Sequence, residues 1–193
     1  MSTPATESVS LPQRPKRADA ARNYDKLVAA AREAFTDDGA DASLEGIARG
    51  AGVGIGTLYR NFPSRQALLE AVYVDEVDSI CRAAEDLGHL EPWDALAAWL
   101  RSFARYATTK HALLGELMAY MGKEAAVFTR CRQSIMTAGA PLLEAAKEAG
   151  AVRPDIEFVD VIRMVGSIAN IPNAEPGQVD RILNVALDGL RPR

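Results

Sequence analysis

The sequence has little cysteine, little histidine and no long apolar run, and each shortage excludes a class of protein. Its two cysteines, Cys81 and Cys131, have no Cys or His partner at metal spacing, which argues against a disulfide framework and a zinc site. The longest apolar run, Ala95 to Leu100, is far shorter than the roughly 20 residues of a membrane span. The first 20 residues are polar and contain proline, unlike a signal peptide. We therefore expect a cytoplasmic protein that uses no membrane, metal or cofactor.

A strand signal is also missing, because no window of four or more alternating β-branched residues occurs. The 193 residues are 48% hydrophobic and 25% charged, which is typical of a folded globular protein. From about Ala18 onward, apolar residues recur at helical spacing between prolines and glycines. We predict an all-α fold with about nine helices, including a separate short helix that ends near Met121.

The chain has fewer basic than acidic residues overall, and the basic ones are concentrated toward its N-terminal part. The net charge is −4, yet residues 1–65 carry nine Lys and Arg against eight Asp and Glu. Five of these basic residues are Arg14, Lys16, Arg17, Arg22 and Lys26. They either contact phosphate or keep a terminal segment solvated, and charge alone does not decide between the two.

Patterns of catalysis and nucleotide binding are absent as well. Glycine stands at every second position from Gly50 to Gly56, which fits neither of the two phosphate-binding glycine motifs. The two histidines, His89 and His111, have no nucleophile beside them, and the spacing expected of a catalytic site does not occur. These absences argue against an enzyme, which is kept only as an alternative.

What remains is a pair of short helices joined by a glycine-bearing turn. Ser43 is a good N-cap for the first helix, and the second is closed by Pro63. This is the pattern of a helix-turn-helix, in which the second helix enters the major groove. Residues 1–17 hold three prolines among polar residues and are predicted to form a flexible arm.

The segment 43–69, SLEGIARGAGVGIGTLYRNFPSRQALL, closely resembles the DNA-binding domain of the TetR family of transcriptional repressors. The resemblance covers about residues 18–73, and beyond these only the helical layout and the length agree. It implies an arm (1–17), a helix-turn-helix domain (18–63) and a helical domain for effector binding and dimerisation (64–193). Two departures are Gly54, where the family often has a hydroxyl residue, and Gly46, which lies inside the first short helix.

The resemblance also implies a set of residues that contact DNA. Ser43 would cap its helix and meet a phosphate, Thr57 and Tyr59 would anchor the backbone, and Arg65 would supply a basic phosphate contact. The groove-facing residues implied are Ile55, Gly56, Thr57, Tyr59, Arg60 and Asn61. In the arm, Arg14, Lys16 and Arg17 would reach phosphates or the minor groove. The alternative for Tyr59 is partial burial with an unused hydroxyl.

Two groups of apolar residues in the second half have two interpretations each. The resemblance implies an effector cavity lined by Trp99, Phe103, Tyr106, Met118, Met121, Phe128 and Met136. The alternative is that this stripe only packs the core. The last two amphipathic segments are predicted to form a dimer interface through Val161, Val165, Ile168, Val179, Ile182 and Ala186. The alternative is that both segments belong to the core of one protomer.

The sequence thus predicts a homodimeric repressor that binds a palindromic DNA operator and is released by a small, apolar effector. The resemblance implies that the effector tilts the helix after Pro63. This tilt would separate the two recognition helices, which are the second short helix of each protomer. A regulator of the same fold with a filled core, controlled by a partner protein, is the main alternative. An enzyme that uses the helical core is the other.

Overall fold

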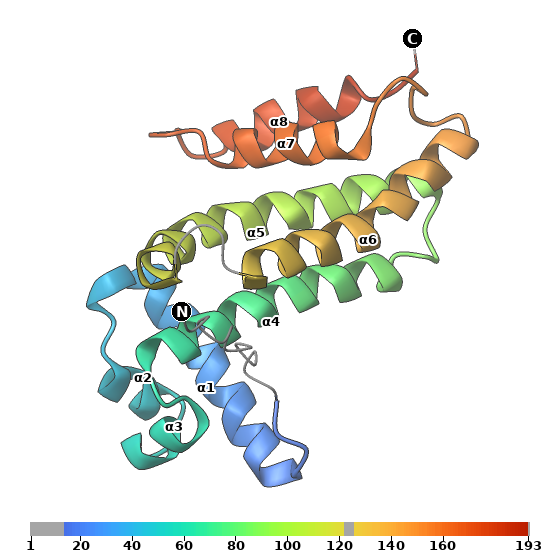
Figure 1. The fold of residues 1–193 in the computed structure, drawn as a ribbon. Helices are drawn as coiled ribbons and strands as arrows, with labels where there is room; N and C mark the ends of the chain where they lie inside the picture. Colours follow the sequence, from blue (N-terminus) through green and yellow to red (C-terminus); the bar gives the residue numbers. More distant parts are fainter. Residues whose placement is uncertain (1–13, 122–125, 193) are drawn as a thin grey trace, which may run out of the picture. The chain divides into compact units, whose positions relative to one another are not determined.

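The computed structural model describes residues 14–121 and 126–192, and within these ranges it has eight α-helices and no β-strand. The helices, shown in Figure 1, are α1 (Ala18–Asp37), α2 (Leu44–Gly50), α3 (Ile55–Asn61), α4 (Arg65–Asp86), α5 (Pro92–Met121), α6 (Ala126–Glu148), α7 (Phe158–Ala169) and α8 (Gln178–Asp188). A 3-10 turn, Gly39–Asp41, lies between α1 and α2. The all-α prediction is confirmed, with eight helices in place of about nine.

The difference in number arises in α5, which runs unbroken through a polar segment where two helices were expected. The Thr108 hydroxyl lies 3.2 Å from the carbonyl oxygen of Ala104, one turn earlier in the same helix. It lies equally far from the carbonyl oxygen of Ala169 in α7. A polar residue that interrupts the apolar pattern is therefore satisfied without ending the helix.

The chain divides into two compact units, Met1–Val72 and Tyr73–Arg193, and the division falls within α4. The functional boundary that the sequence suggests after residue 63 stays a prediction. None of the helices in the described residues is long and apolar enough to cross a membrane.

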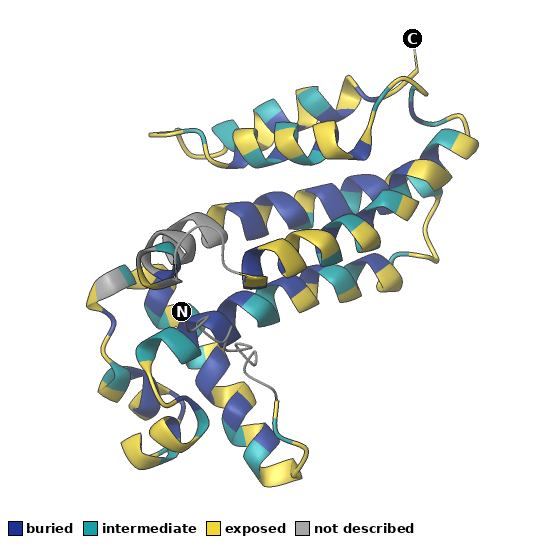
Figure 2. Ribbon diagram, in the orientation of Figure 1, coloured by how far each residue is buried: buried dark blue, intermediate teal, exposed yellow. Residues whose placement is uncertain are grey.

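In the first unit, α1, α2 and α3 share a small apolar core. The ring of Tyr24 in α1 lies 4.9 Å from the ring of Phe62, which directly follows α3. Leu27 and Leu58 are fully buried beside them, and Figure 2 shows the buried face of α1. Because α3 has only seven residues, it is too short to be stable alone, and this packing holds it in place.

In the second unit, α5 packs against α6 and α7, and α7 packs against α8. The buried Trp99 of α5 lies 5.8 Å from the ring of Phe103 and 5.8 Å from the ring of Phe158 in α7. Its indole N–H donates a hydrogen bond of 3.0 Å to the carbonyl of Ile80 in α4. A Cβ atom at Gly139 of α6 would lie 2.4 Å from ring atoms of both Trp99 and Phe158. Glycine therefore lets α6 approach this aromatic cluster.

Candidate functional site

The turn between α2 and α3 is built by local hydrogen bonds. The Ser43 hydroxyl accepts a hydrogen bond of 3.0 Å from the N–H of Gly46 and so caps α2, as predicted. The helix ends at Gly50, and two residues later Gly52 has a φ of +67°, which favours glycine. The N–H of Val53 donates back to the carbonyl of Ala48 over 3.0 Å. These bonds close α2, with the left-handed Gly52 directly after the C-cap residue Ala51, and direct the chain into α3.

The short helix α3 presents one face to the core and the other to solvent. Leu58 is fully buried, whereas Gly56 and Arg60 are exposed. Tyr59 is 47% exposed and Ile55 is 36% exposed. At 47% exposure Tyr59 is still partly covered, so the anchoring role of its hydroxyl stays a prediction. Four of the residues predicted to face the DNA groove therefore lie on the solvent side of α3, whose other side is held by the buried Leu58. These four are Ile55, Gly56, Tyr59 and Arg60.

Thr57 and Asn61 are half-buried, and each takes part in a hydrogen bond within α3. The Arg60 guanidinium donates a hydrogen bond of 2.9 Å to the Thr57 hydroxyl. The Asn61 side-chain amide donates one of 2.8 Å to the Thr57 carbonyl. Thr57 therefore orients the guanidinium of Arg60, a role that the sequence did not indicate.

Arg65 has partners inside the protein where the sequence analysis expected a phosphate. Its guanidinium donates to the carbonyl of Ala42 and, over 3.1 Å, to the carbonyl of Gly39. The same group lies over the ring of Phe35, 4.9 Å from its centroid. Arg65 thus ties the start of α4 to the connection between α1 and α2.

The basic residues before α1 are not equivalent. Arg14 forms a two-point ion pair with Asp25 of α1, at 2.7 and 2.6 Å, and this contact lowers the pKa of the Asp25 carboxyl. Lys16 and Arg17 are exposed. Residues 1–13, the rest of the predicted arm, lie outside the described residues.

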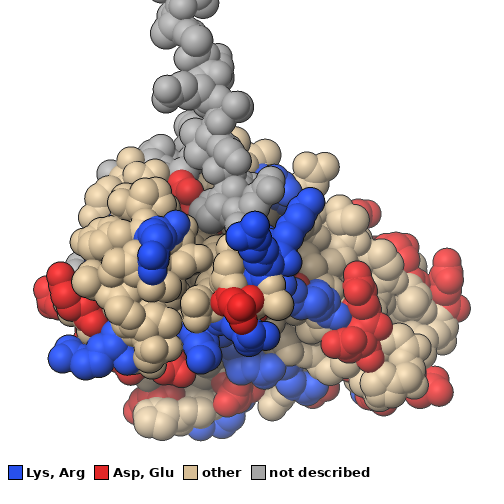
Figure 3. Space-filling view, turned by 90° about the horizontal axis from the view of Figure 1, so that it is seen from below, with Lys and Arg blue, Asp and Glu red and all other residues tan. Residues whose placement is uncertain are grey.

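Exposed Lys and Arg side chains surround the helix-turn-helix. In the first unit they include Lys16, Arg17, Arg22, Lys26, Arg49 and Arg60. Figure 3, a view from below, shows Lys and Arg side chains at the surface with Asp and Glu side chains among them. Exposed Lys and Arg side chains are the groups that contact phosphates in nucleic-acid complexes.

The predicted effector residues lie mostly inside the core of the second unit. Trp99, Phe103 and Tyr106 are buried, as is Phe128, whose ring meets that of Tyr73 edge-on at 5.5 Å. Met118 and Met136 are half-buried, and the side chain of Met121 lies outside the described ones. An effector cavity among these seven residues stays a prediction. The ring of Phe103 packs against those of Trp99 and Tyr106.

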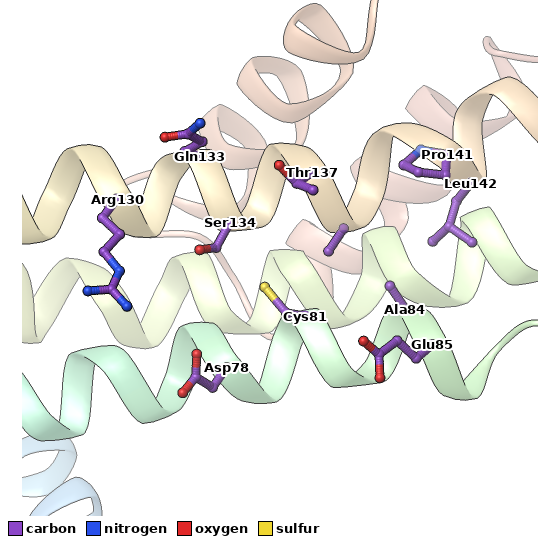
Figure 4. Close-up of a pocket in the computed structure, with 11 residues that line it drawn as sticks. Asp78, Cys81, Ala84, Glu85, Arg130, Gln133, Ser134, Thr137, Pro141 and Leu142 are labelled. Atoms are coloured by element: carbon purple, nitrogen blue, oxygen red, sulfur yellow. The ribbon is translucent and has the colours of Figure 1, made fainter. Parts of the chain in front are cut away.

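A groove between α4 and α6, which the sequence analysis missed, has a volume of about 670 Å³. Its walls, drawn in Figure 4, are formed by Asp78, Cys81, Ala84, Glu85, Arg130, Gln133, Ser134, Thr137, Ala138, Pro141 and Leu142. None of the predicted effector residues lines it. Each wall mixes charged and small residues, so neither has an apolar stripe that would have revealed the groove.

The predicted dimer residues fall on different faces of α7 and α8. Val161 and Val165 are 1% and 0% exposed, so these two residues are buried within the protomer, and their assignment to a dimer interface is corrected. Ile168, Val179, Ile182 and Ala186 are partly exposed. The sequence analysis missed Val185 and Val159, which are 73% and 40% exposed. Val185 follows Ile182 by three residues, which is the signal that could have shown an outward apolar stripe.

Comparison with known proteins bears on both units. The family model described as "Bacterial regulatory proteins, tetR family" matches residues 27–72. The model described as "Transcriptional regulator SbtR-like, C-terminal domain" matches residues 91–192.

Solved structures and a curated relative agree with these matches. A TetR transcriptional regulator of Streptomyces coelicolor is 43% identical, with 88% of this chain and 98% of that chain covered and a TM-score of 0.78. A TetR transcription regulatory protein of Mycobacterium vanbaalenii is 32% identical, with 92% and 100% covered and a TM-score of 0.75. The HTH-type transcriptional regulator UidR of Escherichia coli (strain K12) is 27% identical over 145 residues, which are 72% of this chain and 74% of the relative.

Proposed function

This chain belongs to the TetR family of helix-turn-helix transcriptional regulators, and we propose that it represses transcription by binding a near-palindromic operator as a homodimer. The family consists of regulators and not of enzymes. The proposed place of action is the cytoplasm, where bacterial DNA is accessible. A small molecule that binds the second unit releases the DNA.

The observation that carries this proposal is the outward face of α3. Tyr59, Ile55 and Arg60 extend from a helix whose other face is fixed by the buried Leu58. A rigid helix with exposed tyrosine and arginine suits the major groove, where side chains meet both phosphates and base edges. The hydrogen bond from Arg60 to Thr57 holds the guanidinium near the helix surface until DNA competes for it.

The proposed phosphate contacts are Ser43, Thr57, Tyr59 and Arg65, with Arg14, Lys16 and Arg17 from the arm. Gly56 permits close approach of α3 to the DNA, and Asn61 supports Thr57 from within the helix. Arg14 would have to leave Asp25 to reach a phosphate, whereas the exposed Lys16 and Arg17 need no such exchange. We therefore expect Lys16 and Arg17 to contribute more to binding than Arg14.

The proposed dimer forms through the outward faces of α7 and α8. These faces present Val159, Ile168, Val179, Ile182, Val185 and Ala186. A valine exposed to 73% favours a partner surface, because large apolar groups gain free energy when they leave water. Twofold symmetry would place the recognition helices about 34–36 Å apart, and the operator would share that symmetry.

The effector is proposed to act by shifting a population of two conformations. Moving such an equilibrium from 1:99 to 99:1 requires a preference of about 5.5 kcal/mol for the state that does not bind DNA. The α4–α6 groove of about 670 Å³ falls within the usual size of small-molecule sites. It is therefore a better candidate than the aromatic stripe, whose rings are buried.

The packed aromatic cluster favours a second candidate, a regulator of the same fold that answers to a partner protein. Its core would need no cavity, which agrees with the buried Trp99, Phe103 and Phe128. A purified chain that releases its operator when a small molecule is added excludes this candidate.

The test of the proposed function is selection of an operator from genomic fragments, followed by gel-shift titration. Tyr59→Phe removes one hydroxyl from the exposed face of α3 and should weaken operator binding by about tenfold or more, since a hydrogen bond to a charged group contributes about 1.5–3 kcal/mol. The matched control is Tyr120→Phe, at a second tyrosine that is 53% exposed but lies in α5. Equal operator affinity of the two variants would show that Tyr59 makes no anchoring contact.

A further inference from the structure

The groove between α4 and α6 has two chemically different ends. Asp78 and Arg130 stand at one end, and Glu85 stands at the other beside Ala84 and Leu142 (Figure 4). The helices α4 and α6 run in the same direction along the groove, so in both walls the residue numbers rise from the Asp78 end to the Glu85 end. Seven residues of helix separate Asp78 from Glu85, or about 10.5 Å along the axis.

The charged side chains that line the groove are exposed to solvent and have no partner within the described residues. Among the described residues, neither a hydrogen bond nor an ion pair engages the side chains of Asp78, Glu85 and Arg130. Arg130 lies at the same end of the groove as Asp78, without a direct ion pair between them. No groove residue of opposite charge stands at the other end, so Glu85 has no counter-ion there.

The middle of the groove, at Cys81, lies between two negatively charged side chains. Cys81 lies half-buried between the two carboxylates. Burial raises the pKa of the Cys81 thiol most, Asp78 and Glu85 raise it further, and Arg82 lowers it. The two carboxylates that line the groove on either side of this thiol disfavour an anionic ligand and favour a cationic one.

Apolar surface lies next to Glu85. Ala84, Ala138, Pro141 and Leu142 line this half of the groove. A ligand that rests on them removes apolar area from water, which favours binding. A purely apolar ligand would also take water from the carboxylate of Glu85 without replacing it, which is unfavourable.

We propose that this groove is the effector site and that it binds an organic ammonium ion with an apolar body. The nitrogen pairs with Glu85, and the apolar body lies along Ala84, Ala138 and Leu142. The proposal rests on the proposed function, because it names the class of the effector. Residues 73–86 of α4 form one wall, and the same helix begins at Arg65 in the DNA-binding unit, so a ligand that displaces α4 acts on both units through one helix.

The first experiment compares three probes of equal chain length on the full-length protein. Octylammonium, octan-1-ol and octanoate carry a positive charge, none and a negative charge. We expect octylammonium to bind about three- to fivefold more tightly than octan-1-ol by calorimetry, as expected of a partly exposed ion pair, and octanoate to bind most weakly. Equal binding of all three would overturn the assignment of a cation.

The second experiment locates the binding site through Cys81. Octylammonium should slow alkylation of Cys81 by iodoacetamide, followed by peptide mass spectrometry, while the buried Cys131 serves as the internal reference. Binding that leaves the alkylation rate of Cys81 unchanged would place the ligand elsewhere and overturn the proposal.

The third experiment changes the counter-ion. Glu85→Gln should reduce octylammonium affinity to that of octan-1-ol, and Glu85→Lys should reverse the preference in favour of octanoate. Glu148→Gln is the matched control, because Glu148 is exposed in α6 and does not line the groove. If Glu148→Gln weakens binding as much as Glu85→Gln does, the effect is one of net charge, and Glu85 is not the partner.

Operator binding separates this proposal from the one on which it rests. Octylammonium should lower operator affinity of the unaltered chain by a factor that Glu85→Gln reduces. If the chain binds its operator but octylammonium has no effect, the effector assignment fails and the proposed function stands. If octylammonium protects Cys81 but no operator is bound under any condition, the proposed function fails, and the groove remains a cation site without the regulatory role.

Discussion

Arg65 combines a position expected to face phosphate with contacts that stabilise the fold. Its guanidinium donates to the carbonyls of Ala42 and Gly39 and lies over Phe35. Arginine can donate five N–H groups, so binding a phosphate does not require losing both carbonyls. The two roles can be separated because one contributes to folding and the other only to DNA binding.

Arg65→Ala should therefore lower the free energy of unfolding by about 1–2 kcal/mol, since two carbonyls lose a charged donor. Urea denaturation measures this change. If Arg65 also binds a phosphate, the slope of log K against log salt for the operator should flatten by about 0.9 for each phosphate that the variant no longer neutralises. A variant with unchanged urea stability and a flatter salt slope would show that the phosphate is the main partner. Arg65→Lys keeps the charge but not the planar fork, and it should recover the slope better than the stability.

Tyr73 and Tyr106 make the fold sensitive to alkaline pH. Burial raises the pKa of Tyr73 to about 12 and raises the pKa of Tyr106 as well. A tyrosine whose folded pKa exceeds the unfolded value of about 10 adds stability that is complete below that pH and is lost as pH rises through the folded pKa. Between about pH 10 and 12 the free energy of unfolding should thus fall, by up to about 2 kcal/mol for Tyr73. In Tyr73→Phe, urea denaturation across this range should show a shallower decline, and an unchanged decline would assign the effect to other groups.

At the scale of elements, α6 depends on one glycine for its position against the aromatic cluster. Gly139→Ala would place a Cβ atom 2.4 Å from ring atoms of Trp99 and Phe158, and Trp99 has little room to move away because it packs against both Phe103 and Phe158. We expect a loss of about 3 kcal/mol, at the upper end of overpacking effects, measured by thermal or urea denaturation.

The matched control for this prediction is Ala145→Leu on the exposed side of α6. It adds more atoms than Gly139→Ala does, yet leucine has nearly the helix propensity of alanine, so its stability should be close to that of the unaltered chain. Similar losses in both variants would mean that α6 tolerates no added bulk at all, and the close approach at Gly139 would not be the cause.

At the scale of the whole molecule, the proposed dimer depends on which faces of α7 and α8 remain outside the protomer. Val185→Asp changes a side chain that is 73% exposed, so the protomer should fold with unchanged helical circular dichroism. Sedimentation should show a monomer, and operator affinity should fall by at least about 100-fold, because one recognition helix cannot hold two half-sites.

Val165→Asp is the informative comparison, because Val165 is 0% exposed. An unpaired charge in the core should unfold the chain. If Val185→Asp remains dimeric and binds the operator normally, the dimer uses another surface.

Much of the DNA-binding unit was determined locally by the sequence. The hydroxyl of Ser43, the glycine at Gly52 and the apolar spacing through Leu58 specify a cap, a turn and a buried face, because each acts within a few residues along the chain. The all-α class followed for the same reason, since helical hydrogen bonds and periodicity are local.

Tertiary structure alone decided which partners the remaining side chains have. Arg65 binds carbonyls 23 and 26 residues away, and Thr108 meets a carbonyl of α7, 61 residues away. An apolar stripe on α7 is wide enough to serve either a core or a partner, and only packing against α5 shows that Val165 belongs to the core. The α4–α6 groove exists because two helices that are distant in sequence lie side by side, and periodicity within one helix carries no information about its neighbour.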